Sequence, residues 1–125
     1  MSLPEGLTDE DLDVVAMGFK RYQQLQQKYL VYPQPHNNLA YPIFGVVGEL
    51  GEFVQKLKKN QRDGDGLITP KLIGELEEEL GDIVWYLQAI CGELNTSLEE
   101  CAVRNLKKIF GRKERGTIHG DGDDR

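Results

Sequence analysis

Two short acidic motifs carry the most chemistry in this sequence. Glu49 and Glu52 form one motif, Glu79 and Asp82 form the other, and in each the acids are separated by Leu-Gly. Both lie in stretches whose apolar spacing predicts a helix, where residues i and i+3 project from one face. The chain between the motifs is long enough for the second helix to fold back antiparallel to the first. Four carboxylates could then converge at one point.

Four carboxylates in contact need a counter-charge, because like charges at this distance oppose folding. A divalent cation provides it, and hard oxygen ligands favour Mg²⁺ or Mn²⁺ over zinc. A di-iron carboxylate bundle would need Glu-x-x-His twice. Neither motif contains histidine, so the di-iron interpretation and a histidine-ligated metallohydrolase are both set aside.

The spacing of apolar residues and the capping signals predict four helices and no strand. The expected ranges are Thr8 to about Tyr29 or Leu30, Ala40 to about Asn60, Thr69-Pro70 to about Leu94, and Ser97 to about Phe110. Thr8, Thr69 and Ser97 are N-cap residue types, and Ser97 with Glu100 matches a capping box. The chain is therefore expected to be an all-α protein.

The second and third helices each show an apolar stripe beside their acids. The stripes consist of Ile43, Val46, Leu50, Phe53, Val54 and Leu57, and of Leu76, Leu80, Ile83, Leu87 and Ile90. We expect both stripes to be buried, with the acids at the border between core and solvent. Gly45, Gly48 and Gly51 each cost about 1 kcal/mol relative to alanine inside a helix. They therefore indicate close approach by another backbone or by a ligand.

Two further features allow a structural or a functional interpretation. Residues 31–39 are predicted to form a loop containing His36, either a solvated, proline-stiffened connection or one wall of a ligand pocket. Lys56 lies on the same helical face as the first acidic motif. It could pair with Glu52 at i,i+4 or contact a substrate.

The composition limits the class of protein. A chain of 125 residues is expected to form one domain, spanning 1–125, with flexible tails at 1–7 and 116–125. The net charge of −6 disfavours broad nucleic-acid binding. There is no apolar run of 18 residues and no signal peptide, so no membrane association is expected. Cys91 and Cys101 are expected to be small buried hydrophobes, which suits the cytoplasm.

Several motifs, in this order, resemble the MazG-like branch of the all-α nucleoside triphosphate pyrophosphohydrolases. They are Tyr41-Pro42, Gly48-Glu49-Leu50-Gly51-Glu52, Leu57-Lys58-Lys59, Glu79-Leu80-Gly81-Asp82 with Ile83-Val84-Trp85-Tyr86-Leu87, Asn105-Leu106-Lys107-Lys108, and Arg112-Lys113-Glu114-Arg115-Gly116. The resemblance covers roughly Tyr22 to Arg125. The combined order of Glu-x-x-Glu, Glu-x-x-Asp and Asn-x-x-Lys is more specific than any one motif.

The resemblance implies a four-helix MazG-like antiparallel bundle that assembles as a homodimer or homotetramer. It also implies hydrolysis of a (d)NTP to the (d)NMP and pyrophosphate with Mg²⁺, Mn²⁺ being the alternative. Nucleotide-pool house-cleaning is the expected role. Glu49, Glu52, Glu79 and Asp82 would then be the metal ligands and catalytic residues.

The expected substrate-binding residues are basic or amide side chains. Asn105 and Lys108 match the motif associated with nucleotide contact, Arg112 and Arg115 are candidates for phosphate binding, and Lys56 is added from helical geometry. Two alternatives stay open. One is a dUTP- or dCTP-selective enzyme of the same fold, and the other is a non-catalytic helical dimer that acts as a regulatory module.

Overall fold

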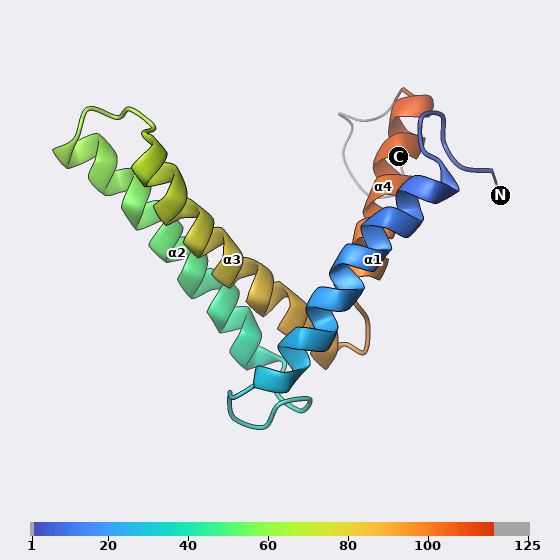
Figure 1. Cartoon of the computed structure of the whole chain (residues 1–125), viewed down its shortest axis with the longest axis horizontal. Helices are drawn as coiled ribbons and strands as arrows, with labels where there is room; N and C mark the ends of the chain where they lie inside the picture. The colour runs from blue at the N-terminus through green and yellow to red at the C-terminus, as the bar shows by residue number, and fades with distance from the viewer. Residues whose placement is uncertain (1, 117–125) are drawn as a thin grey trace. The chain divides into compact units, whose positions relative to one another are not determined.

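The computed structural model describes residues 2–116, and within them all regular elements are helices joined by loops (Figure 1). The elements are α1 (Asp9–Gln26), the 3₁₀ helix η1 (Gln27–Tyr29), α2 (Ala40–Asp63), α3 (Pro70–Glu93) and α4 (Leu98–Glu114). No strand occurs within 2–116, which confirms the all-α prediction. The flexible tail expected from Gly116 onward lies, after that residue, outside the described residues.

The chain divides into two compact units, Met1–Lys28 with Thr96–Arg125, and Tyr29–Asn95. The first unit pairs α1 with α4, and the second pairs α2 with α3. In each unit the two helices run antiparallel (Figure 1). We refer to the α2–α3 pair as the hairpin. A single domain in which all four helices form one bundle stays a prediction.

The N-cap residues begin α1 and α3 as expected. The Thr8 hydroxyl accepts a hydrogen bond from the Asp11 N–H at 3.1 Å, and the Asp11 carboxylate accepts one from the Thr8 N–H at 3.0 Å. The Thr8 N–H, as the larger cause, and the Thr8 hydroxyl, which donates to Asp11 Oδ2 at 2.8 Å, lower the pKa of Asp11. The Thr69 hydroxyl accepts from the Leu72 N–H at 3.1 Å, with Pro70 at the first helical position.

The predicted capping box of α4 forms only in part. The Ser97 hydroxyl accepts a hydrogen bond from the Glu100 N–H at 3.2 Å. The Glu100 carboxylate instead pairs with Arg104 Nε at 2.6 Å, one helical turn further on. A charge-assisted bond is stronger than a bond from a neutral backbone N–H, which accounts for this preference.

The loop between η1 and α2 is tied to the end of α3 by one carboxylate. Glu93 Oε1 accepts hydrogen bonds from the Tyr32 hydroxyl at 2.5 Å and the His36 N–H at 2.9 Å, and Oε2 accepts from the Asn38 N–H at 3.1 Å. These bonds outweigh burial and lower the pKa of Glu93. His36 adopts a positive φ of 71°. The loop is thus a built structure in which the backbone, not the imidazole, of His36 makes the contact.

Because of the Tyr32–Glu93 hydrogen bond, we expect the free energy of unfolding to fall at alkaline pH. Burial and the Glu93 charge raise the pKa of Tyr32 to about 12. The stabilisation is complete below the unfolded tyrosine pKa of about 10 and is lost as pH rises from there through 12. We expect Tyr32→Phe to lower the free energy of unfolding by about 1–3 kcal/mol at pH 8, with a smaller difference from wild type above pH 10. Urea unfolding at both pH values tests this, and equal stabilities at pH 8 would contradict it.

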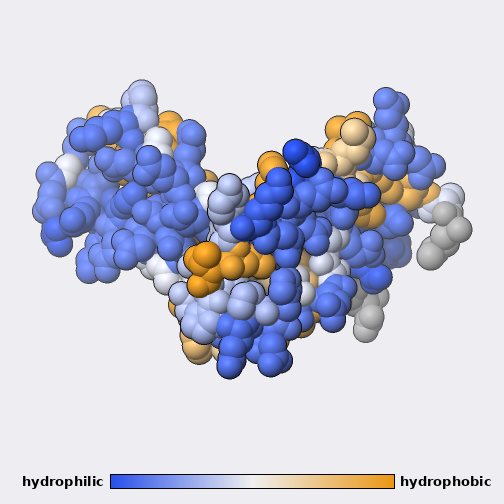
Figure 2. All heavy atoms as spheres, turned by 60° about the horizontal axis from the view of Figure 1, so that its bottom comes forward, coloured by the Kyte–Doolittle hydropathy of each residue, from blue (hydrophilic) through white to orange (hydrophobic). Residues whose placement is uncertain are grey.

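The hydrophobic core of the described residues is small, and both units expose apolar side chains (Figure 2). Leu7 and Leu12 are buried in the first unit, and Tyr32, Leu72, Ala89 and Cys91 in the second. The expectation that both apolar stripes are buried is wrong for this structure, since none of their residues is buried and six are half-buried. Their exposed members are Ile43, Leu50, Val54, Leu80 and Leu87, of which Leu50 and Val54 are 51% and 52% exposed. Two paired helices cover only the strip of each that faces the other.

The two cysteines differ in their surroundings. Cys91 is buried as expected, whereas Cys101 is exposed, so the prediction for Cys101 is wrong. Cys101 lies in the first turns of α4, on a face that α1 does not cover. None of the helices within 2–116 combines the length and the apolar character needed to cross a membrane.

Candidate active site

The acidic motifs meet because α2 and α3 pack antiparallel in a constant register. A Cβ built on Gly45 of α2 would lie 2.4 Å from the Tyr86 ring of α3. Three turns further along α2, the Lys56 ammonium donates to the Glu75 carbonyl at 3.2 Å. Glu49 lies between these two points on α2. Moving toward the end of α2 therefore means moving toward the start of α3.

Three carboxylates from the two motifs converge. Glu49, Glu79 and Asp82 each offer one oxygen, and these oxygens all lie within 4.8 Å of one another. We call these three residues the acidic cluster. Glu52 is exposed and lies outside it, although its charge contributes to the environment of Glu49. The structure thus brings together three of the four predicted acids.

The pKa values of Glu49 and Glu79 are shifted in opposite directions. Burial raises the pKa of Glu49, and the Glu79 hydrogen bond and the charges of Asp82 and Glu79 raise it further. The Lys56 ammonium, by contrast, lowers the pKa of Glu79. Two carboxylates in contact cannot both stay ionised at low cost, so Glu49 is the one that takes up a shared proton first.

Lys56 bridges the hairpin. Its ammonium lies 2.8 Å from Glu79 Oε1 and donates to the Glu75 carbonyl at 3.2 Å. The predicted alternative, a pair with Glu52 on the same helix, is therefore wrong. Glu79 and Glu75 lie across the hairpin, where the lysine reaches both, and the side chain is drawn to the larger local negative charge.

The acidic cluster fits a hard divalent cation. Magnesium takes oxygen ligands at about 2.0–2.1 Å, so two oxygens on one ion are at most about 4.2 Å apart. Oxygens within 4.8 Å of one another need only a small rotamer adjustment to reach that separation. The mutual repulsion that raises the pKa of Glu49 would be relieved by the same ion.

Aromatic side chains adjoin the acidic cluster toward the start of α2. The Tyr32 and Tyr41 rings stack with centroids 5.1 Å apart. Burial raises the pKa of Tyr86, and the charges of Tyr41, Glu49 and Asp82 add to the rise. The sequence motifs include Tyr41 and Tyr86 but not Tyr32. The stacking depends on the Glu93-anchored loop, which has no local sequence signal.

A groove of about 570 Å³ lies at the opposite side of the acidic cluster, where α2 ends and α3 begins. Its lining includes Lys56, Lys59, Asn60, Thr69, Lys71 and Glu75, and we call it the basic groove. Sequence reasoning missed Lys59 and Lys71 as site candidates. The register of the hairpin, continued by one turn beyond Lys56 and Glu75, would have predicted their proximity.

The remaining predicted binding residues lie on α4, in the first unit. Asn105 and Lys108 line one groove of about 530 Å³ together with Cys101, Arg104 and Lys107. Arg112 is buried, with only 4% of its surface exposed. The structure thus brings Asn105 and Lys108 together but does not place Arg112 in their groove.

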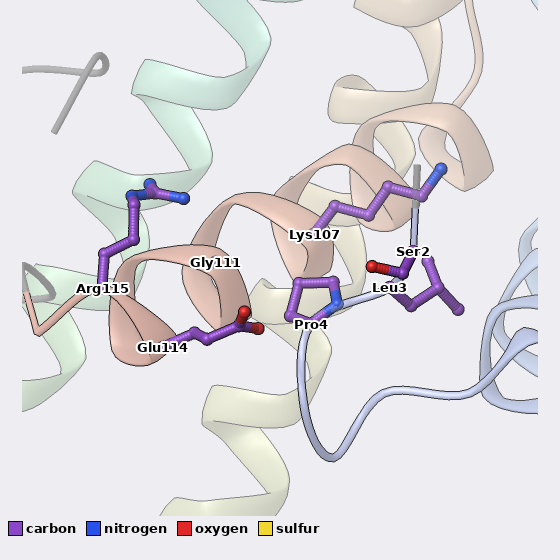
Figure 3. A pocket seen from close by; sticks show the side chains of 7 residues that line it. All are labelled: Ser2, Leu3, Pro4, Lys107, Gly111, Glu114 and Arg115. Atoms are coloured by element: carbon purple, nitrogen blue, oxygen red, sulfur yellow. The ribbon is translucent and has the colours of Figure 1, made fainter.

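Arg115 lies in a different cavity, of about 440 Å³, formed by the end of α4 and residues 2–4 (Figure 3). Its guanidinium folds back over Gly111, where an added Cβ would lie 2.9 Å from Nη1. Glu114, beside it, accepts a hydrogen bond from the Glu5 N–H at 3.1 Å. The N-terminal segment is thus fastened to α4 at this point.

Comparison with known proteins covers all the helices that carry candidate residues. A family model described as "MazG nucleotide pyrophosphohydrolase domain" matches residues 36–117. The chain is 45% identical over 87 residues to the "Gene 37 protein" of Mycobacterium phage L5, an alignment covering 70% of this chain and 76% of that protein. No solved structure matches this chain significantly.

Proposed function

This chain belongs to the MazG nucleotide pyrophosphohydrolase family, and we propose on that basis that it hydrolyses a (d)NTP to the (d)NMP and pyrophosphate. The proposed role is removal of unwanted nucleotides from the pool. The proposal rests on the acidic cluster, in which one oxygen from each of three carboxylates lies within 4.8 Å of the other two, close enough for one bound ion. We propose Mg²⁺ as the cofactor, with Mn²⁺ as the alternative.

The proposed ligands are Glu49, Glu79 and Asp82, with Glu52 as a fourth carboxylate that a side-chain rotation would bring in. A cation held by these carboxylates would neutralise phosphate oxygens and make water a better nucleophile. Lys56 keeps Glu79 ionised and in place by its 2.8 Å contact. One of the four carboxylates would also orient the attacking water.

We further propose that α4 contributes to nucleotide binding. Asn105 and Lys108 share one groove and offer an amide and an ammonium to a phosphate or sugar. Arg115 and Arg112 are weaker candidates, because Arg115 lines another cavity and Arg112 is buried. They would act by holding the end of α4 in position.

Assembly as a homodimer or homotetramer is part of the proposal. Exposed apolar residues recur at helical spacing on both helices of the hairpin. They are Ile43, Val47, Leu50 and Val54 on α2, and Ile73, Leu80, Leu87 and, at the end of α3, Leu94. Rows of this kind suit burial against a second copy.

The proposed activity is tested by measuring release of pyrophosphate and nucleoside monophosphate from a panel of ribo- and deoxyribonucleoside triphosphates that includes dUTP and dCTP. We expect turnover with Mg²⁺ and none with excess chelator, because the acidic cluster needs the cation to approach a phosphate. The panel also separates a selective enzyme from a broad one. No product from any triphosphate, with Mg²⁺ or Mn²⁺, would refute the activity and favour the regulatory module.

A further inference from the structure

Charge and chemical character change in a fixed order along the hairpin. The aromatic side chains Tyr41 and Tyr86 come first, the acidic cluster follows, and the basic groove lies beyond it. Lys56 links the last two regions, because it contacts Glu79 of the cluster and also lines the groove. The two regions are therefore continuous within one compact unit.

Three lysines, Lys56, Lys59 and Lys71, and two acids, Asp63 and Glu75, line the basic groove. Neither Lys59 nor Lys71 forms an ion pair within residues 2–116, so both ammonium groups are available. Of the acids that line the groove, Asp63 is held by Arg62 through two bonds of 2.8 and 2.7 Å. The groove also includes Thr69 and Lys71 at the start of α3, a helix of 24 residues, whose positive dipole end adds to the lysines.

Hydrogen bonds in the turn between α2 and α3 order the backbone beside the basic groove. Asn60, which lines the groove, donates from its side-chain Nδ2 to the Leu67 carbonyl at 3.1 Å. The backbone carbonyl of Asn60 accepts hydrogen bonds from the Gly64 and Gly66 N–H groups. These bonds close the turn between α2 and α3, and Lys59 and Lys71 lie on the two helices that this turn joins. Lys59 lies three residues beyond Lys56, about 4.5 Å along the helix, within reach of a diphosphate next to the cluster.

We propose that the basic groove binds the β- and γ-phosphates of the substrate and the pyrophosphate that leaves, which orients the triphosphate along the hairpin with its terminal phosphate toward the α2–α3 turn. This inference rests on the proposed function. In the reaction, the water oxygen forms a bond to the α-phosphorus and the bond from that phosphorus to the α–β bridging oxygen breaks. The bridging oxygen leaves with the pyrophosphate and carries the negative charge toward Lys56, Lys59 and Lys71, while the protons of the water pass to solvent.

The test uses a double variant, Lys59→Gln with Lys71→Gln, in the full chain. The matched control is Lys20→Gln with Lys58→Gln, which removes the same charge from exposed helical positions outside the groove. Calorimetric titration with inorganic pyrophosphate, with and without Mg²⁺, is compared with titration by a nucleoside monophosphate. We expect the groove variant to weaken pyrophosphate binding about tenfold or more, with little change for the monophosphate, and the control to behave as wild type.

Steady-state kinetics supplies the second readout. We expect the groove variant to raise KM for the triphosphate and the inhibition constant of pyrophosphate by similar factors. If wild type turns over substrate but the groove variant binds pyrophosphate as the control does, the groove proposal is overturned. Absence of pyrophosphate binding by wild type also overturns it. Lysine-dependent pyrophosphate binding without turnover would uphold the groove and refute the hydrolase.

Discussion

Asp82→Asn is expected to lower turnover of the best triphosphate by on the order of 10³-fold, because a bound cation is worth several kcal/mol of transition-state stabilisation and each 1.36 kcal/mol is a factor of ten. The substitution keeps the size of the side chain and removes its charge. The helices should stay folded. Relief of the repulsion on Glu49 should leave stability without Mg²⁺ unchanged or slightly raised.

Thermal unfolding with and without Mg²⁺ gives a readout that does not depend on turnover. A ligand that binds only the folded state stabilises it by about 2.7 kcal/mol at a concentration of 100 Kd. Wild type should therefore melt higher with Mg²⁺, and Asp82→Asn should lose most of that rise. Glu77→Gln removes an exposed charge from the same helix and should behave as wild type.

Glu52→Gln should lower turnover less than Asp82→Asn, because Glu52 lies outside the acidic cluster. Full activity in Asp82→Asn would remove that residue from the site.

Gly45→Ala is expected to destabilise the hairpin by roughly 1–3 kcal/mol, even though alanine is favoured over glycine in a helix by about 1 kcal/mol. The added Cβ would lie 2.4, 2.5 and 2.6 Å from Cδ1, Cγ and Cε1 of Tyr86. These atoms include the base of the ring, so a rotation of its far end cannot relieve the overlap. Urea unfolding measures the loss directly.

A double-mutant cycle shows whether the Tyr86 ring is the cause. In a Tyr86→Ala background the overlap is gone, so Gly45→Ala should be neutral or stabilising there. Gly18→Ala is the matched control, since nothing lies within 4 Å of a Cβ at that position of α1. It should stabilise by up to about 1 kcal/mol. Equal effects of Gly45→Ala in the two backgrounds would show that the ring does not set the helix spacing.

The three closely spaced glycines of α2 differ in what lies against them. Three glycines in seven residues predicted close approach by another backbone or a ligand, but the group that lies against Gly45 is the side-chain ring of Tyr86. Gly48 and Gly51 have nothing within 4 Å of a built Cβ. Composition signals that a side chain is missing, but which neighbour fills that space depends on the partner helix.

The sequence by itself determined the helices, most of their caps and the two acidic motifs, because these follow from residue spacing and from bonds between residues three or four apart. Only the tertiary structure decided that Glu49, Glu79 and Asp82 converge while Glu52 does not, and that Lys56 crosses to α3. It also decided that Glu93 holds the loop before α2, and that Lys59 and Lys71 share a groove. These contacts depend on the register and rotation of two helices against each other, which are set by packing across the hairpin and leave no trace in the spacing along either helix.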